Sequence, residues 1–301
     1  MTITIEQVVA QIPQWTGRSV SVEPLHGGLT NANYRVTIDG TPYSVRIPGA
    51  ATELLAVDRT NEFYNTRAAG ETGVCPRVLY HLPEHHVMIL EFIRGETMSM
   101  AKLQQPGYPT RIARSLRKLH RGPRFRNDFN MFRLVEFYLT IVAQHGVRIP
   151  QSYRDYLPHV ARIEAALGHH PLPTVPCNND LLAGNYIDDG QQLWLIDFEY
   201  SGNNDPCFEL GNTCQELQFD ESRQAEMCVA YFGEADPGKL SRMKLNMIMS
   251  DVGWTLWAAI QARISAIEFD YWGWATERWA RAEAKMNSPE FATWLADVAV
   301  G

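Results

Sequence analysis

One short stretch of the sequence combines residue types that suit phosphoryl transfer. Asp180 and Asn185 lie five residues apart in the segment NDLLAGN, and Asp197 follows an apolar run that ends at Ile196. In this chemistry one aspartate orients the attacking hydroxyl and accepts its proton, while an asparagine and a second aspartate hold the Mg²⁺ that neutralises the polyphosphate. The pattern predicts Asp180 as the base and Asn185 and Asp197 as metal ligands. The alternative is a set of ordinary turn residues, like those at 188–190.

The end of the chain is rich in aromatic side chains that could bind a cation. Six of the eight tryptophans follow residue 250, namely Trp254, Trp257, Trp272, Trp274, Trp279 and Trp294. Trp254 and Trp257 are three residues apart and would share one face of a helix. With Tyr200 and the carboxylate of Glu216, they offer what a quaternary ammonium requires, because that group donates no hydrogen bond and binds through cation–π attraction and charge. The alternatives are tryptophans in a helical core and Glu216 on a solvated helix face, beside Glu209.

The elements that must position these residues change in kind near residue 95. Before it, alternating apolar residues predict strands at 20–22, 33–38, 43–47 and 87–92, with a turn at 39–40 and a helix over 55–69. Beyond it, helical periodicity covers 112–119, 131–146, 150–168, 206–218, 221–232, 238–267 and 271–285, and a hairpin is expected from 185–187 and 193–196. This order predicts an α+β fold, with a small β-rich lobe over residues 1–93 and a larger helical lobe over 94–301.

Composition narrows the possible partners. The 301 residues contain 27 Lys and Arg against 34 Asp and Glu, a net charge of −7 without a basic run, so no nucleic-acid partner is expected. The longest uncharged apolar stretch, 252–260, is too short to cross a bilayer, and no membrane insertion is expected. Five cysteines without a CxxC pair predict reduced thiols in a cytoplasmic protein. The motifs of P-loop kinases, serine hydrolases and zinc proteases are absent from the sequence. The oligomeric state is left open.

The segments NDLLAGN and LIDFEY together resemble the choline/ethanolamine kinase family, a branch of the protein-kinase-like fold that includes the aminoglycoside phosphotransferases. The likeness extends over about residues 20–285 and includes GGLTN at 27–31, YSVRI at 43–47 and LEFI at 90–93. It implies a two-lobed protein, with an antiparallel-sheet N-terminal lobe, a helical C-terminal lobe and Mg-ATP bound in the cleft between them.

The resemblance also implies a role for each part of the site. The nucleotide would contact Gly27, Gly28, Thr30, Asn31, the phosphate clamp Arg46 with its partner Glu62, and the adenine hinge with Glu91 and Ile93. Glycines allow backbone amides to approach phosphate oxygens, although an isolated Gly-Gly pair more often marks a turn. A fixed guanidinium at Arg46 could bind phosphates, the alternative being an exposed charge on a strand. The acceptor pocket would be lined by Tyr200, Glu216, Trp254, Trp257 and Trp274.

One position departs from the family pattern. The family usually has histidine two residues before the catalytic aspartate, whereas this chain has Asn178. Asparagine can donate a comparable hydrogen bond but lacks the ring that packs beneath the loop, which questions the rigidity of the loop. The resemblance implies transfer of the γ-phosphoryl group of ATP to the hydroxyl of choline. Ethanolamine, thiamine or an aminoglycoside is the alternative acceptor, and a non-catalytic nucleotide- or amine-binding protein is the alternative class.

Overall fold

A five-stranded antiparallel sheet forms the small lobe of the protein. The computed structural model describes residues 3–25, 30–49 and 52–300. The strands are β1 (Val20–Leu25), β2 (Asn31–Ile38), β3 (Thr41–Pro48), β4 (Val78–Leu82) and β5 (Val87–Glu91), in the order β1-β2-β3-β5-β4. Asp39 and Gly40, with φ values of 47° and 84°, make the tight turn between β2 and β3 that was expected at this position. In this hairpin Asn33 of β2 is paired with Arg46 of β3, so the position of Arg46 is set by the register of the two strands.

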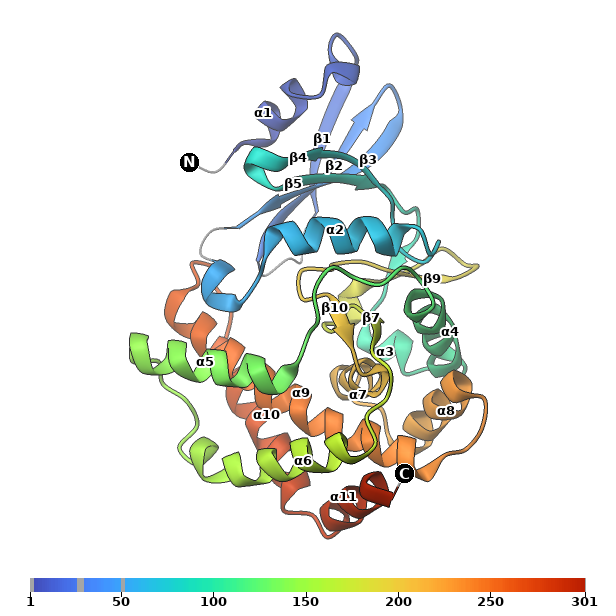
Figure 1. Cartoon of the computed structure of the whole chain (residues 1–301). Coiled ribbons are helices and arrows are strands. Elements are labelled where there is room, and N and C mark those ends of the chain that lie inside the picture. The colour runs from blue at the N-terminus through green and yellow to red at the C-terminus, as the bar shows by residue number, and fades with distance from the viewer. Residues whose placement is uncertain (1–2, 26–29, 50–51, 301) are drawn as a thin grey trace.

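Two helical segments pack with this sheet. The short helix α1 (Ile5–Ala10) begins at a capping box between Thr4 and Gln7, and its buried Val8 joins Val36, Val45 and Ile89 in the core of the small lobe. The longer helix α2 (Arg59–Gly70) begins after its N-cap Asp58, which explains why it starts later than the expected residue 55. In Figure 1, α2 lies between the sheet and the helical lobe.

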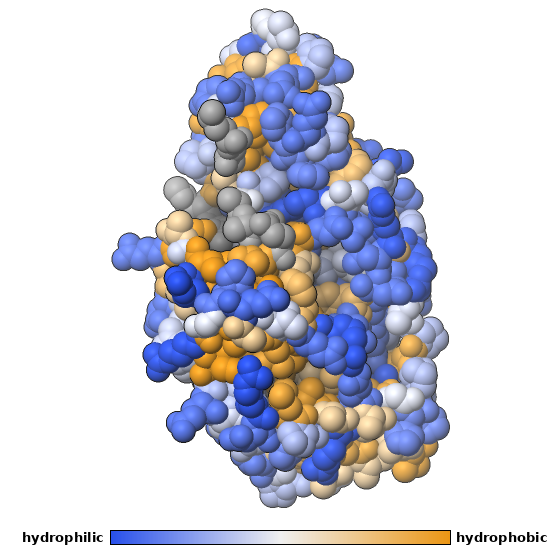
Figure 2. Space-filling view, turned by 60° about the vertical axis from the view of Figure 1, so that its left-hand side comes forward, coloured by the Kyte–Doolittle hydropathy of each residue, from blue (hydrophilic) through white to orange (hydrophobic). Residues whose placement is uncertain are grey.

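The large lobe is built around one long buried helix. Its helices are α3 (Met100–Leu103), α4 (Tyr108–His120), α5 (Met131–His145), α6 (Leu157–His169), α7 (Pro206–Glu216), α8 (Glu221–Phe232), α9 (Pro237–Ile264), α10 (Tyr271–Met286) and α11 (Glu290–Val300). Helix α9 is buried continuously from Leu245 to Gln261 and packs against α5, α7, α10 and α11. It therefore holds the tryptophans at 254 and 257 in a fixed frame. The narrow upper lobe and the wider lower lobe are both visible in Figure 2, where hydrophobic surface gathers on the wider part.

Short strands at the junction of the lobes carry the two candidate motifs. Strand β6 (Glu96–Thr97) pairs with β8 (Tyr186–Asp188), which pairs with β9 (Leu193–Leu195) in the expected hairpin. Strand β7 (Val175–Cys177) pairs with β10 (Gly202–Asn204). The loop 178–185 therefore connects β7 to β8, and Asp197 lies between β9 and β10. The two motifs lie close together because the strands before and after each of them pair with one another, β7 with β10 and β8 with β9.

The α+β, two-lobed fold expected from the sequence is confirmed, and the division between residues 93 and 94 stays a proposal. The helix expected over 150–168 begins only at Leu157, after a 3₁₀ turn at 153–156, and the one expected over 238–267 ends at Ile264. The elements α1, β4, α3, β6, β7, β10 and α11 were not expected. All five cysteines, each within the described residues, are buried and unpaired. No helix in the described part of the chain is long and apolar enough to cross a membrane.

Candidate active site

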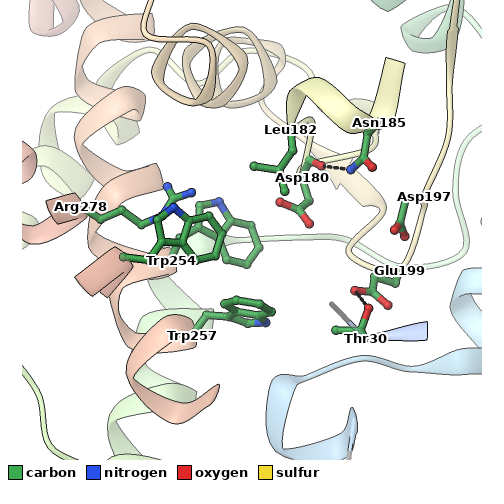
Figure 3. Close-up of a pocket in the computed structure, with 10 residues that line it drawn as sticks. Thr30, Asp180, Leu182, Asn185, Asp197, Glu199, Trp254, Trp257 and Arg278 are labelled. Atoms are coloured by element: carbon green, nitrogen blue, oxygen red, sulfur yellow. Dashed lines mark hydrogen bonds between the residues drawn. The ribbon is translucent and has the colours of Figure 1, made fainter. Parts of the chain in front are cut away.

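A pocket between the lobes brings the two candidate groups of residues together. It is lined by Thr30, Asp180, Leu182, Asn185, Asp197, Glu199, Trp254, Trp257, Trp274 and Arg278. Figure 3 shows Asp180, Asn185 and Asp197 on one side of this pocket and the indoles of Trp254 and Trp257 on the other. The candidate phosphoryl-transfer residues and the candidate cation-binding tryptophans, which lie far apart in the sequence, thus line the same pocket.

The loop 178–185 is held by its own side chains. Asn185 donates from Nδ2 to the carbonyl oxygen of Asp180 at 2.7 Å, which leaves its Oδ1 available to a ligand. Asn179 has a φ of 70°, a left-handed conformation that asparagine tolerates better than most residues. Its Nδ2 donates to the carbonyl oxygen of Tyr200 at 3.1 Å. These bonds fix Asp180 and Asn185 relative to each other.

Asn178 makes the hydrogen bond that was expected of it. Its Nδ2 donates to the carbonyl oxygens of Asp197 at 2.7 Å and Ile196 at 3.2 Å, and its Oδ1 accepts the backbone N–H of Asp180 at 3.1 Å. One buried amide therefore links the loop of the candidate base to the segment of the candidate metal ligand. The departure from histidine keeps this link.

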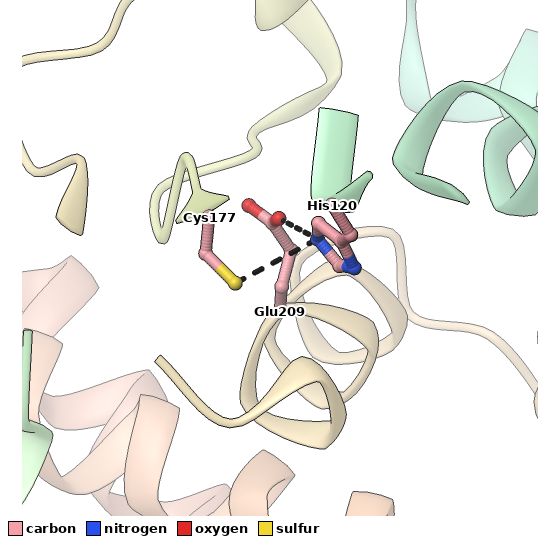
Figure 4. A group of neighbouring side chains, drawn as sticks. All are labelled: His120, Cys177 and Glu209. Atoms are coloured by element: carbon pink, nitrogen blue, oxygen red, sulfur yellow. Dashed lines mark hydrogen bonds and ion pairs between the residues drawn. The ribbon is translucent and has the colours of Figure 1, made fainter. Parts of the chain in front are cut away.

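A buried carboxylate lies under the same loop. Glu209 on α7 accepts the backbone N–H groups of Asn178 at 2.7 Å and Asn179 at 2.9 Å through Oε1, and its Oε2 lies 2.5 Å from Nε2 of His120. Cys177 Sγ lies 3.6 Å from the same nitrogen. Figure 4 shows these three side chains together, with Cys177 and Glu209 both directed at the ring of His120. The other ring nitrogen bonds Tyr231 at 2.7 Å. Since Glu209 and His120 are both saturated by protein partners, this group is a support for the loop.

The alternative of a solvated helix face for Glu216, beside Glu209, is excluded, because the Glu216 side chain is 4% exposed and Glu209 is buried as well. The exposed fraction of Glu209 is 0%, and α7 is buried from Pro206 to Gln215. The pattern of polar and apolar residues on α7 indicated an amphipathic helix, but the polar side faces buried partners in place of water. Sequence periodicity reports where polar groups lie and not what they contact.

Arg46 lies at the centre of a buried ionic network. Its Nη2 lies 2.6 Å from Asp197, 3.1 Å from Glu199 and 3.2 Å from Glu62, so the expected pair with Glu62 is present. The side chain is 8% exposed, which excludes the alternative of an exposed strand charge. Arg59, which sequence reasoning missed, adds contacts to Glu62 at 2.7 Å and Glu199 at 3.2 Å.

Glu199 is a second residue that sequence reasoning missed. It accepts hydrogen bonds from Thr30 Oγ1 and Asn31 Nδ2, both at 2.9 Å, in addition to the two guanidinium contacts. Burial, with the nearby charge of Asp197, raises its pKa. The only signal in the sequence was its place in LIDFEY, two residues after Asp197. Three carboxylates face two guanidinium groups here, and the excess negative charge suits a cation.

The donor set fits Mg²⁺. Asp197 and Glu199 supply carboxylate oxygens at the pocket and Asn185 supplies Oδ1, and hard oxygen ligands are those that Mg²⁺ prefers. Asp197 also has a φ of 65°, an uncommon conformation for aspartate, and such conformations persist where the surrounding structure holds them. The predicted ligands Asn185 and Asp197 both line the pocket, and Figure 3 shows them on the same side of it.

Asp180 is half-buried in this wall. Burial raises the pKa of its carboxyl well above the usual range, and the charges of Asp197, Glu216 and Glu199 act in the same direction, while Arg278 opposes them. A higher pKa makes the ionised carboxylate a stronger base. The carboxylate is therefore suited to accept a proton from an acceptor hydroxyl.

The aromatic wall is oriented by hydrogen bonds behind it. Trp257 donates from Nε1 to the hydroxyl of Tyr200 at 2.7 Å, and Trp254 donates to Oδ1 of Asn212 at 2.9 Å. The rings of Trp257 and Trp274 meet edge to face at 5.7 Å. Both polar indole groups of α9 are used behind the wall, so aromatic surface remains for the pocket. Tyr200 lies behind the tryptophans and does not belong to the described lining.

Glu216 also lies behind the wall. Both of its oxygens contact Arg278, at 2.5 and 2.7 Å. Arg278, which sequence reasoning missed, does line the pocket, and its guanidinium lies 4.1 Å from the ring centroid of Trp274. A role of Glu216 toward a cation would therefore act at a distance, through a carboxylate already paired with Arg278.

The remaining predicted residues concern the nucleotide. Gly27 and Gly28 lie outside the described residues. Glu91 ends β5 and contacts Arg77 at 2.7 Å, and Ile93 is half-buried in the segment that joins the lobes. Their nucleotide roles stay predictions.

Comparison with known proteins places this geometry in a family. The sequence profile described as choline/ethanolamine kinase matches residues 22–231. A solved choline/ethanolamine kinase family protein from Mesorhizobium loti is 37% identical, with 97% of each chain covered and a TM-score of 0.87. Choline kinase LicA from Streptococcus pneumoniae is 25% identical, with 93% of this chain and 98% of that chain covered and a TM-score of 0.79. Ethanolamine kinase 1 of Mus musculus is 28% identical, with 88% of this chain and 84% of its own covered. The expected phosphotransferase class is confirmed, and the chain belongs to the choline/ethanolamine kinase family.

Proposed function

We propose that this protein transfers the γ-phosphoryl group of Mg-ATP to the hydroxyl of choline, giving phosphocholine. The observation that carries the proposal is the shared pocket, in which Asp180 faces the tryptophans of α9 and α10. A choline molecule with its trimethylammonium group against Trp254, Trp257 and Trp274 would direct its hydroxyl toward Asp180. The base and the cation site are then used by the two ends of one small substrate.

Asp180 would orient the acceptor hydroxyl and accept its proton as the new bond to phosphorus forms. General-base assistance of this kind contributes about 10²- to 10⁴-fold in rate. Its position is fixed from two sides, because Asn178 holds its backbone amide and Asn185 holds its carbonyl oxygen. Holding the hydroxyl in line with the phosphorus is the larger part of such catalysis.

The nucleotide would lie beside the network of Arg46 and the first residues of β2. Asn185 and Asp197 would hold Mg²⁺, which would neutralise charge on the polyphosphate. Arg46 would contact the phosphates, because a guanidinium binds phosphate oxygens well and this one lies 2.6 Å from Asp197 at the pocket. Thr30, Asn31, Gly27 and Gly28, with Glu91 and Ile93 at the hinge, remain the proposed nucleotide contacts.

Ethanolamine is the second candidate acceptor, because ethanolamine kinases are among the relatives of this chain. The two differ in what they require of the pocket. A primary ammonium donates three hydrogen bonds, whereas a quaternary ammonium needs aromatic faces and negative charge. The tryptophan wall offers aromatic faces, and the carboxylate of Glu216 behind it is already paired with Arg278. These contacts favour choline.

A coupled kinase assay with choline, ethanolamine, thiamine and an aminoglycoside tests the proposal. Choline is expected to give the highest kcat/KM. A higher kcat/KM for ethanolamine would reassign the acceptor within the family. A protein that binds Mg-ATP but phosphorylates none of the four would support the non-catalytic alternative.

A further inference from the structure

A buried cluster of charges lies directly behind the acceptor wall. Asp251 on α9 has an exposed fraction of 0% and contacts three basic side chains of α10. Its Oδ1 lies 2.6 Å from Nη2 of Arg281 and 3.6 Å from Nη1 of Arg278, and its Oδ2 lies 3.9 Å from Nζ of Lys285. The three basic residues follow one another at helical spacing, so one face of α10 is directed at one carboxylate.

Arg278 connects this cluster to the pocket. It is the one basic residue among the ten that line the pocket in the described part of the chain. Its guanidinium lies over the ring of Trp274, and the side chain as a whole is 1% exposed. Two carboxylates flank it, Glu216 on one side and Asp251 on the other. A positive charge at this place would repel a cationic acceptor unless both carboxylates compensated it.

The balance of charges depends on Asp251. Glu216 and Asp251 together offset Arg278 and Arg281, and Lys285 adds a third positive group whose pKa is lowered by burial. Buried charges interact strongly with their neighbours because little water screens them. Without Asp251, Glu216 would be the one buried carboxylate of this cluster left against the two arginines, because Glu277, which contacts Arg281, is 59% exposed on its side chain and screened by water. The excess positive charge would lie against the aromatic wall.

We propose that Asp251 is a positioning residue that gives the acceptor pocket its preference for a cation, by holding Arg278 and Arg281 and compensating their charge behind the tryptophans. The inference deepens the proposed function and rests on it. Asp251 lies three residues before Trp254 on α9, so the helix that carries two of the three tryptophans of the wall also carries the carboxylate that makes this wall acceptable to a cation. Asp251 does not line the pocket as the described residues define it, and it acts through Arg278.

A purely structural role for Asp251 gives a different expectation. The carboxylate also ties α9 to α10, and its loss could loosen the whole wall. A loosened wall would weaken every acceptor of the same shape to the same degree, whether the acceptor is charged or neutral. A change in charge would weaken only the charged one. The ratio between two such acceptors therefore separates the two roles.

The test compares Asp251→Asn with the wild-type protein, using choline and its neutral carbon isostere 3,3-dimethylbutanol. If ethanolamine is the better substrate, propan-1-ol replaces dimethylbutanol as its neutral analogue. The ratio of kcat/KM for the charged and the neutral alcohol is measured in one preparation, so the folded fraction cancels. A neutral alcohol that is not phosphorylated is measured as a competitive inhibitor. The ratio is expected to fall about fivefold or more, while KM for ATP stays unchanged.

Two further variants keep the test decisive. Glu277→Gln is the matched control, because Glu277 contacts Arg281 at 3.2 Å on the solvent side, and its ratio is expected to match the wild type. Lys285→Met removes a positive charge near Asp251, and a smaller shift of the ratio in favour of the cation is expected. If Asp251→Asn does not fold, the direction of the Lys285→Met shift decides the matter.

The outcomes for the inference and for the proposed function are distinct. Equal losses for both alcohols in Asp251→Asn, or an unchanged ratio in Lys285→Met, would overturn the inference. Failure of the wild-type protein to phosphorylate any amino alcohol would overturn the proposed function alone. In that case the tryptophan fluorescence of the pocket, titrated with choline and dimethylbutanol, still measures the preference for a cation in each variant.

Discussion

At the scale of single residues, Asp180 combines a chemical advantage with a cost in stability. Its raised pKa makes it a better base, and the same surroundings disfavour its charge. Replacing it with asparagine keeps the shape of the side chain and removes the base. We expect Asp180→Asn to lower kcat by about two orders of magnitude or more, while the affinity for Mg-ATP changes little. Steady-state kinetics and titration calorimetry measure the two quantities. Loss of ATP affinity along with turnover would make Asp180 a metal or structural residue.

The same variant should be more stable than the wild type at neutral pH. Since the pKa of Asp180 is raised in the folded protein above its ordinary value of 3.8, its contribution to stability is fully present below that value and is lost as pH rises through the folded pKa. Asparagine does not titrate. Without Mg²⁺ and nucleotide, Asp180→Asn should melt about 2 °C or more above the wild type at pH 8, and this difference should shrink toward pH 4. If the difference in melting temperature between the variant and the wild type did not change with pH, the pKa of Asp180 would not be raised in the folded protein.

Residue types and spacing identified part of this site. Asp180, Asn185 and Asp197 could be found because one loop and one strand end carry them within 18 residues. Arg59 and Glu199 are separated by 140 positions, and their contact depends on how the lobes meet. Arg278 follows Glu216 by 62 positions and lies in none of the motifs that the sequence analysis used. Sequence patterns do not report such long-range pairs, and the structure was needed to find them.

At the scale of elements, α7 supports the catalytic loop from below. Glu209 accepts two backbone amides of this loop, and His120 of α4 holds Glu209. Glu209→Ala would leave both amides buried without a partner, which costs about 1–3 kcal/mol for each. We expect chemical denaturation to show a loss of about 2–4 kcal/mol and kinetics to show a fall in kcat larger than the rise in KM.

A matched control exists on the neighbouring helix. Glu221 of α8 contacts Lys244 at 3.1 Å and is 86% exposed on its side chain, so Glu221→Ala should leave both stability and kcat nearly unchanged. If Glu209→Ala behaved in the same way, the catalytic loop would not depend on α7 for its conformation.

The elements that the sequence predicted are those with strong periodicity. The strands β2 and β3 and most long helices of the large lobe were found within a few residues, because each has a buried face of its own. The exceptions are α6, which begins seven residues later than expected, and α11, which was not expected. The two-residue strand β6 and the three-residue strands β7 and β10 were missed. Strands this short have too few residues for alternation, and these three pair with distant segments. The equally short β8 and β9 were predicted because a turn joins them into a hairpin. The short helix α1 depends in the same way on the sheet beneath it.

At the scale of the whole molecule, α2 joins the two lobes. It belongs to the small lobe by sequence, yet its fully buried Asn65 is bonded to the large lobe. Asn65 donates from Nδ2 to Oδ1 of Asn127 at 2.8 Å and to the carbonyl oxygen of Ser201 at 3.1 Å, and its Oδ1 accepts the backbone N–H of Arg126 at 2.9 Å. The pocket contains Thr30 from the small lobe, so its shape depends on this junction.

Asn65→Ala should therefore weaken the coupling between the lobes more than it weakens either lobe. Removing the amide leaves the N–H of Arg126 and the carbonyl of Ser201 without this partner, so a loss of about 2–4 kcal/mol is expected. The wild type should unfold in one calorimetric transition, with equal calorimetric and van't Hoff enthalpies. In the variant the van't Hoff enthalpy should fall below the calorimetric value, because the sheet can then melt before the helices. Arg67→Ala, an exposed change on the same helix, is the control and should keep the two enthalpies equal. Two separate transitions in the wild type would show that the lobes unfold independently. An undivided transition in Asn65→Ala would show that other contacts couple the lobes, and the ionic contacts of Glu199 with Arg46 and Arg59 would then be the next junction to test.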